Sequence, residues 1–217
     1  MGYLAEGGYV VAVVLLSRLL HGRCGVGAST TRKLVHILIG FVFPIQYHFF
    51  REDALGMLLL PAIITITLFL VARYRLIPAM VNPENPYGIF YYALGILVLN
   101  LVAVLYPAMH AAEGAAVFSL AFGDGAATLL TPLFKKRHKI FRGKTVEGTL
   151  LCFLFAALGM LLLGLMLPAL MLPPLLILGA AALTALIELF TGRYDNLAIL
   201  FGVAALCLLV TTGGALC

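Results

Sequence analysis

Residues Gly123–Thr149, GDGAATLLTPLFKKRHKIFRGKTVEGT, join two apolar runs through a strongly basic segment. One carboxylate, Asp124, stands between two glycines before the basic segment, and Lys144 and Glu147 stand where the next apolar run begins. Two apolar runs joined by a short basic connection predict a pair of membrane-spanning helices with a cytoplasmic connection. Because an ionisable residue within a span is costly, Asp124 is a candidate functional residue.

The composition excludes a soluble globular domain. Of the 217 residues, 63% are hydrophobic and 11% are charged, whereas a soluble domain has roughly 25% charged residues. Apolar runs of about 20 residues, long enough to cross a bilayer, recur along the chain. We therefore expect an all-α, polytopic transmembrane helical bundle that forms a single integral-membrane domain over residues 1–217, with the first run retained as a helix.

The distribution of charge predicts the orientation of this bundle. Thirteen of the fourteen Lys and Arg residues fall in or beside connections on one side of the predicted spans, and only Arg51 falls on the other. The positive-inside rule places those connections in the cytoplasm and both termini outside it. Since the membrane accounts for this positive charge, it does not indicate nucleic acid. The eight predicted spans are residues 3–20, 34–50, 54–72, 88–106, 111–133, 147–167, 170–190 and 195–212.

Three further polar segments fall on the same predicted side. Arg32, Lys33 and His36 share one helical face, at spacings of three and four residues. Near the C-terminus, Glu188 closes one span, and Asp195-Asn196 opens the next. The proline-rich segment Val81–Tyr87, which includes Glu84, is predicted to be a turn with a structural role.

Simpler roles remain open for these segments. Arg32 and Lys33 could be juxtamembrane anchors, the basic loop could bind anionic lipid, and Asp195 could cap a helix. Gly143-Lys144-Thr145 is not a P-loop, because His138 stands where that motif requires a glycine. Convergence of acids and bases on one side, however, is typical of a site in which Mg²⁺ carries phosphates and Lys or Arg neutralises their charge.

The polar motifs resemble those of one family of membrane enzymes. They are Arg32-Lys33-x-x-His36, Gly123-Asp124-x-Ala126-Ala127, Gly143-Lys144-Thr145-x-Glu147-Gly148-Thr149, and Glu188 with Asp195-Asn196. In this order, they resemble the CTP-dependent lipid-alcohol kinases, which include dolichol kinase, phytol and farnesol kinases, and CTP-dependent diacylglycerol kinase. The resemblance implies a single kinase-like domain over residues 1–217. By this resemblance, the domain is expected to transfer the γ-phosphoryl group of CTP, or another nucleoside triphosphate, to the hydroxyl of a prenol or diacylglycerol at the cytoplasmic face.

The resemblance also implies roles for individual residues, with Mg²⁺ as cofactor and CTP as phosphoryl donor. Catalytic roles are expected of Asp124, Glu147, Lys144 and His36. Metal-binding roles are expected of Asp124, Glu147, Glu188 and Asp195. Nucleotide-binding roles are expected of Arg32, Lys33, Gly123, Gly125, Arg142, Gly143, Thr145, Gly148 and Asn196.

Two other functions fit some of the same residues. A CTP-dependent lipid-phosphate cytidylyltransferase would also use CTP, Mg²⁺ and acids near the membrane, but its product would be a CDP-lipid. An ion- or proton-coupled transporter could use Asp124 as its binding site. A transporter should carry polar residues along several spans, whereas Asn100 is almost the only strongly polar residue deep in another span.

Overall fold

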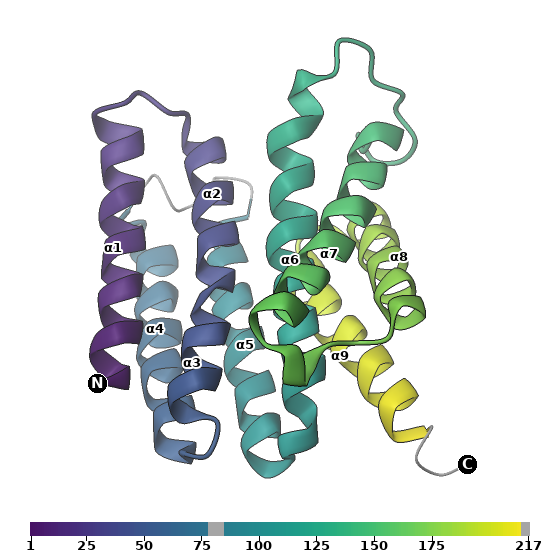
Figure 1. Ribbon diagram of the computed structural model, residues 1–217. Coiled ribbons are helices and arrows are strands. Elements are labelled where there is room, and N and C mark those ends of the chain that lie inside the picture. Colours follow the sequence, from purple (N-terminus) through teal and green to yellow (C-terminus); the bar gives the residue numbers. More distant parts are fainter. Residues whose placement is uncertain (78–84, 214–217) are drawn as a thin grey trace. The chain divides into compact units, whose positions relative to one another are not determined.

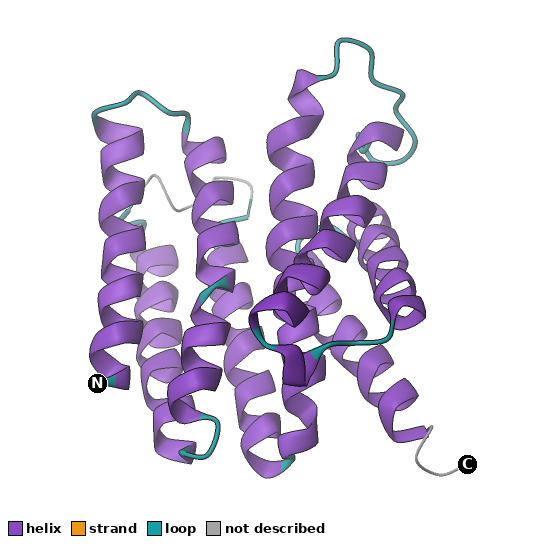
Figure 2. Cartoon of the chain, in the orientation of Figure 1, coloured by secondary structure: helices purple, strands orange, loops and turns teal. Residues whose placement is uncertain are grey.

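The computed structural model describes residues 1–77 and 85–213, and these residues are overwhelmingly helical (Figures 1 and 2). No strand forms among them; Lys139 and Thr145 make one isolated antiparallel bridge. Glu84, with the first part of the predicted Val81–Tyr87 turn, lies outside the described residues. The α-helices are α1 (Gly2–Gly22), α2 (Ala28–Gly40), α3 (Val42–Phe50), α4 (Ala54–Tyr74), α5 (Gly88–Leu105), α6 (His110–Leu130), α7 (Val146–Met166), α8 (Pro174–Phe190) and α9 (Asp195–Gly213).

Seven helical segments in the described chain are long and apolar enough to cross a membrane. The predicted span at 34–50 corresponds to α2 and α3, which together form one such segment, Ala28–Phe50, interrupted at Phe41. Helix α8 is also apolar but has 17 residues, which extend about 26 Å at 1.5 Å per residue. A typical hydrocarbon core is about 30 Å thick. The all-helical fold is confirmed, with seven candidate membrane-spanning segments in the described chain, while the eighth span and the orientation stay predictions.

The chain divides into two compact units, Met1–Pro107 and Ala108–Cys217. In the first unit, α1 packs against α2, α3 and α4, and α4 packs against α5. In the second unit, α6 packs against α7, α8 and α9. We describe each unit by itself.

A buried polar cluster in the first unit surrounds Pro61 of α4. Proline has no N–H to donate to the carbonyl four residues earlier, which here is that of Met57. That carbonyl instead accepts hydrogen bonds from the Gln46 Nε2 of α3, at 3.1 Å, and from the Asn100 Nδ2 of α5, at 2.9 Å. Both side chains are almost completely buried. Neighbouring helices thus supply the donor that the proline removes.

Helix α6 is the centre of the second unit and is buried along most of its length. Its many alanines and glycines allow other helices to approach closely, as is usual in membrane bundles. A Cβ atom added to Gly159 of α7 would lie 2.8 Å from the Phe118 carbonyl oxygen of α6. The hydroxyls of Ser119 and Thr184 form a hydrogen bond that joins α6 to α8. This close packing fixes three of the helices that carry the candidate site.

Candidate functional site

Asp124 lies in the last third of α6 and is 3% exposed. The helix continues without a break through Gly123, Asp124 and Gly125, and both glycines are buried. A Cβ atom on Gly123 would lie 3.1 Å from the Ala156 Cβ and 3.2 Å from the Cys152 carbonyl oxygen. Gly123 therefore allows α6 to pack on α7 beside Asp124. Gly123 was expected to bind nucleotide; in the structure, it lies against α7.

The basic connection between α6 and α7 folds into a short hairpin. The Val146 N–H donates to the His138 carbonyl, and the Ile140 N–H donates to the Lys144 carbonyl, both at 2.9 Å. The chain reverses at Arg142 and Gly143, whose φ angles are 46° and 81°. Glycine adopts such left-handed conformations without strain. The hairpin therefore returns Lys144 to the start of α7.

The first turn of α7 is capped by Thr145. Its hydroxyl accepts a hydrogen bond from the Gly148 N–H at 3.1 Å. A Cβ atom on Gly148 would lie 3.1 Å from the Thr131 hydroxyl oxygen and 3.2 Å from that of Thr145. Because Gly148 has no side chain, the start of α7 has room for both of these hydroxyl groups.

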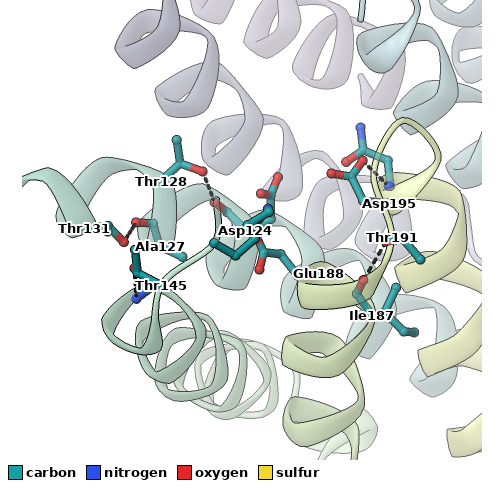
Figure 3. A network of polar contacts seen from close by, with 12 residues as sticks. Asp124, Ala127, Thr128, Thr131, Thr145, Ile187, Glu188, Thr191 and Asp195 are labelled. Atoms are coloured by element: carbon teal, nitrogen blue, oxygen red, sulfur yellow. Dashed lines mark hydrogen bonds and ion pairs between the residues drawn. The ribbon is translucent and has the colours of Figure 1, made fainter. Parts of the chain in front are cut away.

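Lys144 lies among three carboxylates that come from three helices. Its ammonium group forms an ion pair with Glu188 of α8, whose side chain is 8% exposed. Burial, the largest single influence, lowers the pKa of Lys144, but Glu188, together with Asp124 and Asp195, outweighs it and raises the pKa above its ordinary value. Figure 3 shows Asp124, Glu188 and Asp195 on α6, α8 and α9. Lys144 therefore stays positively charged although it is partly buried.

Asp195 and Asn196 begin α9. The Asp195 Oδ1 accepts a hydrogen bond from the Asn196 N–H at 2.8 Å, and Asn196 is 9% exposed. A capping side chain accepts from an N–H two or three residues farther on, whereas this contact is with the next residue, so the capping role of Asp195 stays a prediction. Its carboxylate nevertheless contributes to the field around Lys144.

Glu147 has a different partner. Its carboxylate accepts hydrogen bonds from the backbone N–H of His138, at 3.1 and 3.3 Å, and lies 2.6 Å from the imidazole Nδ1 of the same residue. Glu147 does not line the pocket beside Lys144. Its contact joins the basic hairpin to the first turn of α7.

A pocket of about 250 Å³ opens beside Lys144. Two cationic side chains, Arg137 and Lys144, line it together with four threonines. Hydroxyl, guanidinium and ammonium groups at the start of a helix suit an anion such as phosphate. The lining residues are Ala127, Thr128, Thr131, Pro132, Arg137, Gly143, Lys144, Thr145, Gly148, Thr149 and Glu188.

The predicted metal ligands do not form a preformed cage. Among residues 1–77 and 85–213, no group of three or more His, Cys, Asp or Glu side chains is arranged to hold a metal ion. Glu147 contacts His138, and Glu188 is paired with Lys144. Mg²⁺, however, is often held by one or two carboxylates together with substrate phosphates. Asp124, Asp195 and Glu188 are the carboxylates that fit this second kind of site.

Arg32, Lys33 and His36 lie on α2 in the first unit. The imidazole of His36 stacks on the ring of Tyr92 of α5, with centroids 4.2 Å apart, and the Tyr92 hydroxyl donates to the His36 carbonyl. This contact positions His36 within its own unit. A joint role with the second-unit residues stays a prediction.

Several residues near the site carried no signal that sequence analysis used. Arg137 belonged to a run of basic residues, and Thr128 and Thr131 belonged to the apolar run before it; Thr149 was part of a family-like motif but had no expected role. Only the folded hairpin and the packing of α6 on α7 bring them to one pocket. At the opposite end of α6, away from the site, Glu113 is fully buried. Its Oε2 lies 3.4 Å from the His110 Nδ1, a pairing that only the spacing of three residues could have indicated.

Comparisons of the chain with models of protein families, with curated proteins and with solved structures found no match.

Proposed function

We propose that the protein is a membrane lipid kinase that transfers the γ-phosphoryl group of CTP, or another nucleoside triphosphate, to the hydroxyl of a lipid alcohol. The acceptor is a prenol, such as phytol, farnesol or dolichol, or diacylglycerol. One observation carries the proposal. The charged Lys144 lies among carboxylates from α6, α8 and α9, beside a pocket lined by Arg137 and four threonines.

The pocket supports binding of the phosphates rather than of the whole nucleotide. Its volume of about 250 Å³ is below the roughly 300–1,000 Å³ of most small-molecule sites. Arg137 and Lys144 would neutralise phosphate charge, and the hydroxyl of Thr149, which donates to no other group among the described residues, could donate to a phosphate oxygen. The base and ribose would then lie outside this pocket.

In the proposed reaction, the lipid hydroxyl oxygen attacks the γ-phosphorus, the bond to the β-phosphate oxygen breaks, and the nucleoside diphosphate leaves. Asp124 accepts the hydroxyl proton or helps to hold the ion that accompanies the nucleotide. Mg²⁺, when bound, would reduce the negative charge of the phosphates. Lys144 binds the phosphates, for which it must exchange part of its contact with Glu188.

The site is proposed to face the cytoplasm, where nucleoside triphosphates are available. The basic connection 134–145 supports this orientation through the positive-inside rule. An acceptor dissolved in the bilayer would have to approach Asp124 between packed helices, because this residue is 3% exposed in the structure.

The direct test uses the purified full chain with Mg²⁺, labelled CTP or ATP, and a panel of prenols and diacylglycerol. A lipid monophosphate and a nucleoside diphosphate are expected. A CDP-lipid and pyrophosphate would instead identify a cytidylyltransferase. Failure to modify any acceptor with either nucleotide would contradict the kinase proposal.

Asp124→Asn is the sharpest variant for this reaction. It keeps the size of the side chain and removes its charge, so turnover should fall by roughly 100-fold or more, as expected for loss of a general base. Steady-state kinetics would measure the loss, and size-exclusion chromatography in detergent would check folding. Glu52→Gln, an exposed carboxylate paired with Arg51, is the matched control. Near-normal turnover by a folded Asp124→Asn variant would exclude both roles.

A further inference from the structure

The carboxylate of Glu147 contacts one residue of the basic connection, His138, through both its backbone and its ring. The His138 backbone N–H donates to both carboxylate oxygens, and the His138 Nδ1 lies 2.6 Å from Oε1. Glu147 is 14% exposed in this contact, whereas the His138 side chain is 76% exposed. A carboxylate in the first turn of a helix thus holds an otherwise exposed segment.

The same contact lies at the open end of the hairpin. The Val146 N–H donates to the His138 carbonyl, so His138 is held by the start of α7 through both its backbone and its ring. Farther along, the Ile140 N–H donates to the Lys144 carbonyl, and the Lys144 N–H donates to the Phe141 carbonyl, at 2.8 Å. These hydrogen bonds set the position of Lys144 relative to His138.

The segment held in this way carries both cations of the pocket. Arg137 immediately precedes His138, and Lys144 lies across the hairpin from Ile140. Without the contact at His138, Arg137 would be attached to the protein through an exposed loop alone. The charge of the pocket therefore depends on a contact that lies outside it.

We propose that Glu147 and His138 form a clasp that positions Arg137 and Lys144 to bind a polyphosphate. The choice of polyphosphate as ligand rests on the proposed function. Glu147 is then a positioning residue that acts through the hairpin, a role different from the catalytic and metal-binding roles implied by the resemblance.

If the clasp positions the phosphate-binding cations, its loss should change the KM for CTP much more than kcat. Because phosphate binding is weakened while Asp124 is untouched, His138→Ala and Glu147→Gln should each raise the KM for CTP with kcat within about twofold of wild type. The expected rise is roughly fivefold to tenfold, as for the loss of one typical hydrogen bond. Since either single variant weakens the same imidazole–carboxylate contact, the double variant should raise the KM by less than the product of the two single effects.

The clasp can also be tested by measurements that do not depend on catalysis. Inorganic tripolyphosphate binding is measured by calorimetry, and hydrogen exchange is followed at the Ile140 and Val146 amides, in the full-length protein in detergent. Both variants should weaken tripolyphosphate binding and accelerate exchange at these amides. Glu52→Gln is the control and should change neither quantity.

Two results would overturn the clasp. One is unchanged exchange and tripolyphosphate binding in His138→Ala while Glu147→Gln loses kcat by more than about 100-fold, the size of a directly catalytic contribution. The other is the absence of tripolyphosphate binding to the wild-type protein. If the wild type binds tripolyphosphate and the variants weaken it, but no lipid is phosphorylated, the clasp stands and the proposed reaction fails.

Discussion

At the scale of single residues, Lys144 illustrates how opposing electrostatic effects are decided. Burial disfavours the ammonium form of a lysine, and an adjacent carboxylate favours it. Around Lys144 the carboxylates prevail and its pKa is raised. The neutral amine, which is the nucleophilic form, is therefore scarcer at Lys144 than at an exposed lysine at any given pH.

This difference predicts slow chemical modification. In a pulse of acetic anhydride at pH 8, Lys144 should react more slowly than the exposed Lys135 and Lys136, as quantified by peptide mass spectrometry. Glu188→Gln removes the closest carboxylate, leaves the effect of burial, and should accelerate acetylation of Lys144 alone. Equal rates at all three lysines in both proteins would contradict the electrostatic account.

At the scale of elements, the α3–α4–α5 contact depends on one backbone carbonyl. Pro61 leaves the Met57 carbonyl without its helical donor, and Gln46 and Asn100 replace that donor. Asn100 also donates to the Gln46 Oε1 at 3.2 Å, so the two side chains form a connected pair. This pair gives three helices a polar contact within an otherwise apolar environment.

The contact predicts a rescue between two substitutions. Asn100→Ala should lower the free energy of unfolding in detergent by about 1 kcal/mol, within the range for hydrogen bonds between membrane helices. Pro61→Ala restores an N–H that can donate to the Met57 carbonyl, so the double variant should lose less than Asn100→Ala alone. Thr67→Ala, at an exposed hydroxyl that bonds within its own helix, is the control. If the losses in the free energy of unfolding from Pro61→Ala and Asn100→Ala simply add, the Met57 carbonyl does not link these two residues.

At the scale of the whole molecule, the question is which end of the bundle faces the cytoplasm. The predicted orientation follows from thirteen basic residues on one side of the spans. Cys24 lies on that side, between α1 and α2, and is exposed, whereas Cys152 and Cys207 are buried. The native chain therefore contains a reporter of its own orientation.

In a Cys217→Ser background, a membrane-impermeant maleimide should label Cys24 in inverted vesicles and not in intact cells. Tyr106→Cys, at a 70% exposed position on the opposite side, should give the reverse pattern when Cys24 is replaced by serine. Labelling is read by mass shift after extraction. Labelling of Cys24 from outside intact cells would place the candidate site on the wrong face for a cytoplasmic nucleotide.

The sequence by itself determined the membrane class, the helical character of the chain and most helix positions. These properties follow from the length of each apolar run and the thickness of a bilayer, which require no knowledge of other helices. It also identified Asp124, Lys144 and Glu188 as candidates, because polar residues stand out in apolar runs.

Only the tertiary structure decided which of these residues meet. Lys144 and Glu188 are 44 residues apart and contact each other because α7 and α8 pack together. The hairpin directs Glu147 to His138, and packing of α6 on α7 brings threonines from apolar runs to a pocket with Arg137. Hydropathy cannot distinguish these outcomes, because it records how apolar a segment is and not which helix faces which. Partners were therefore settled by side-chain packing and long-range hydrogen bonds.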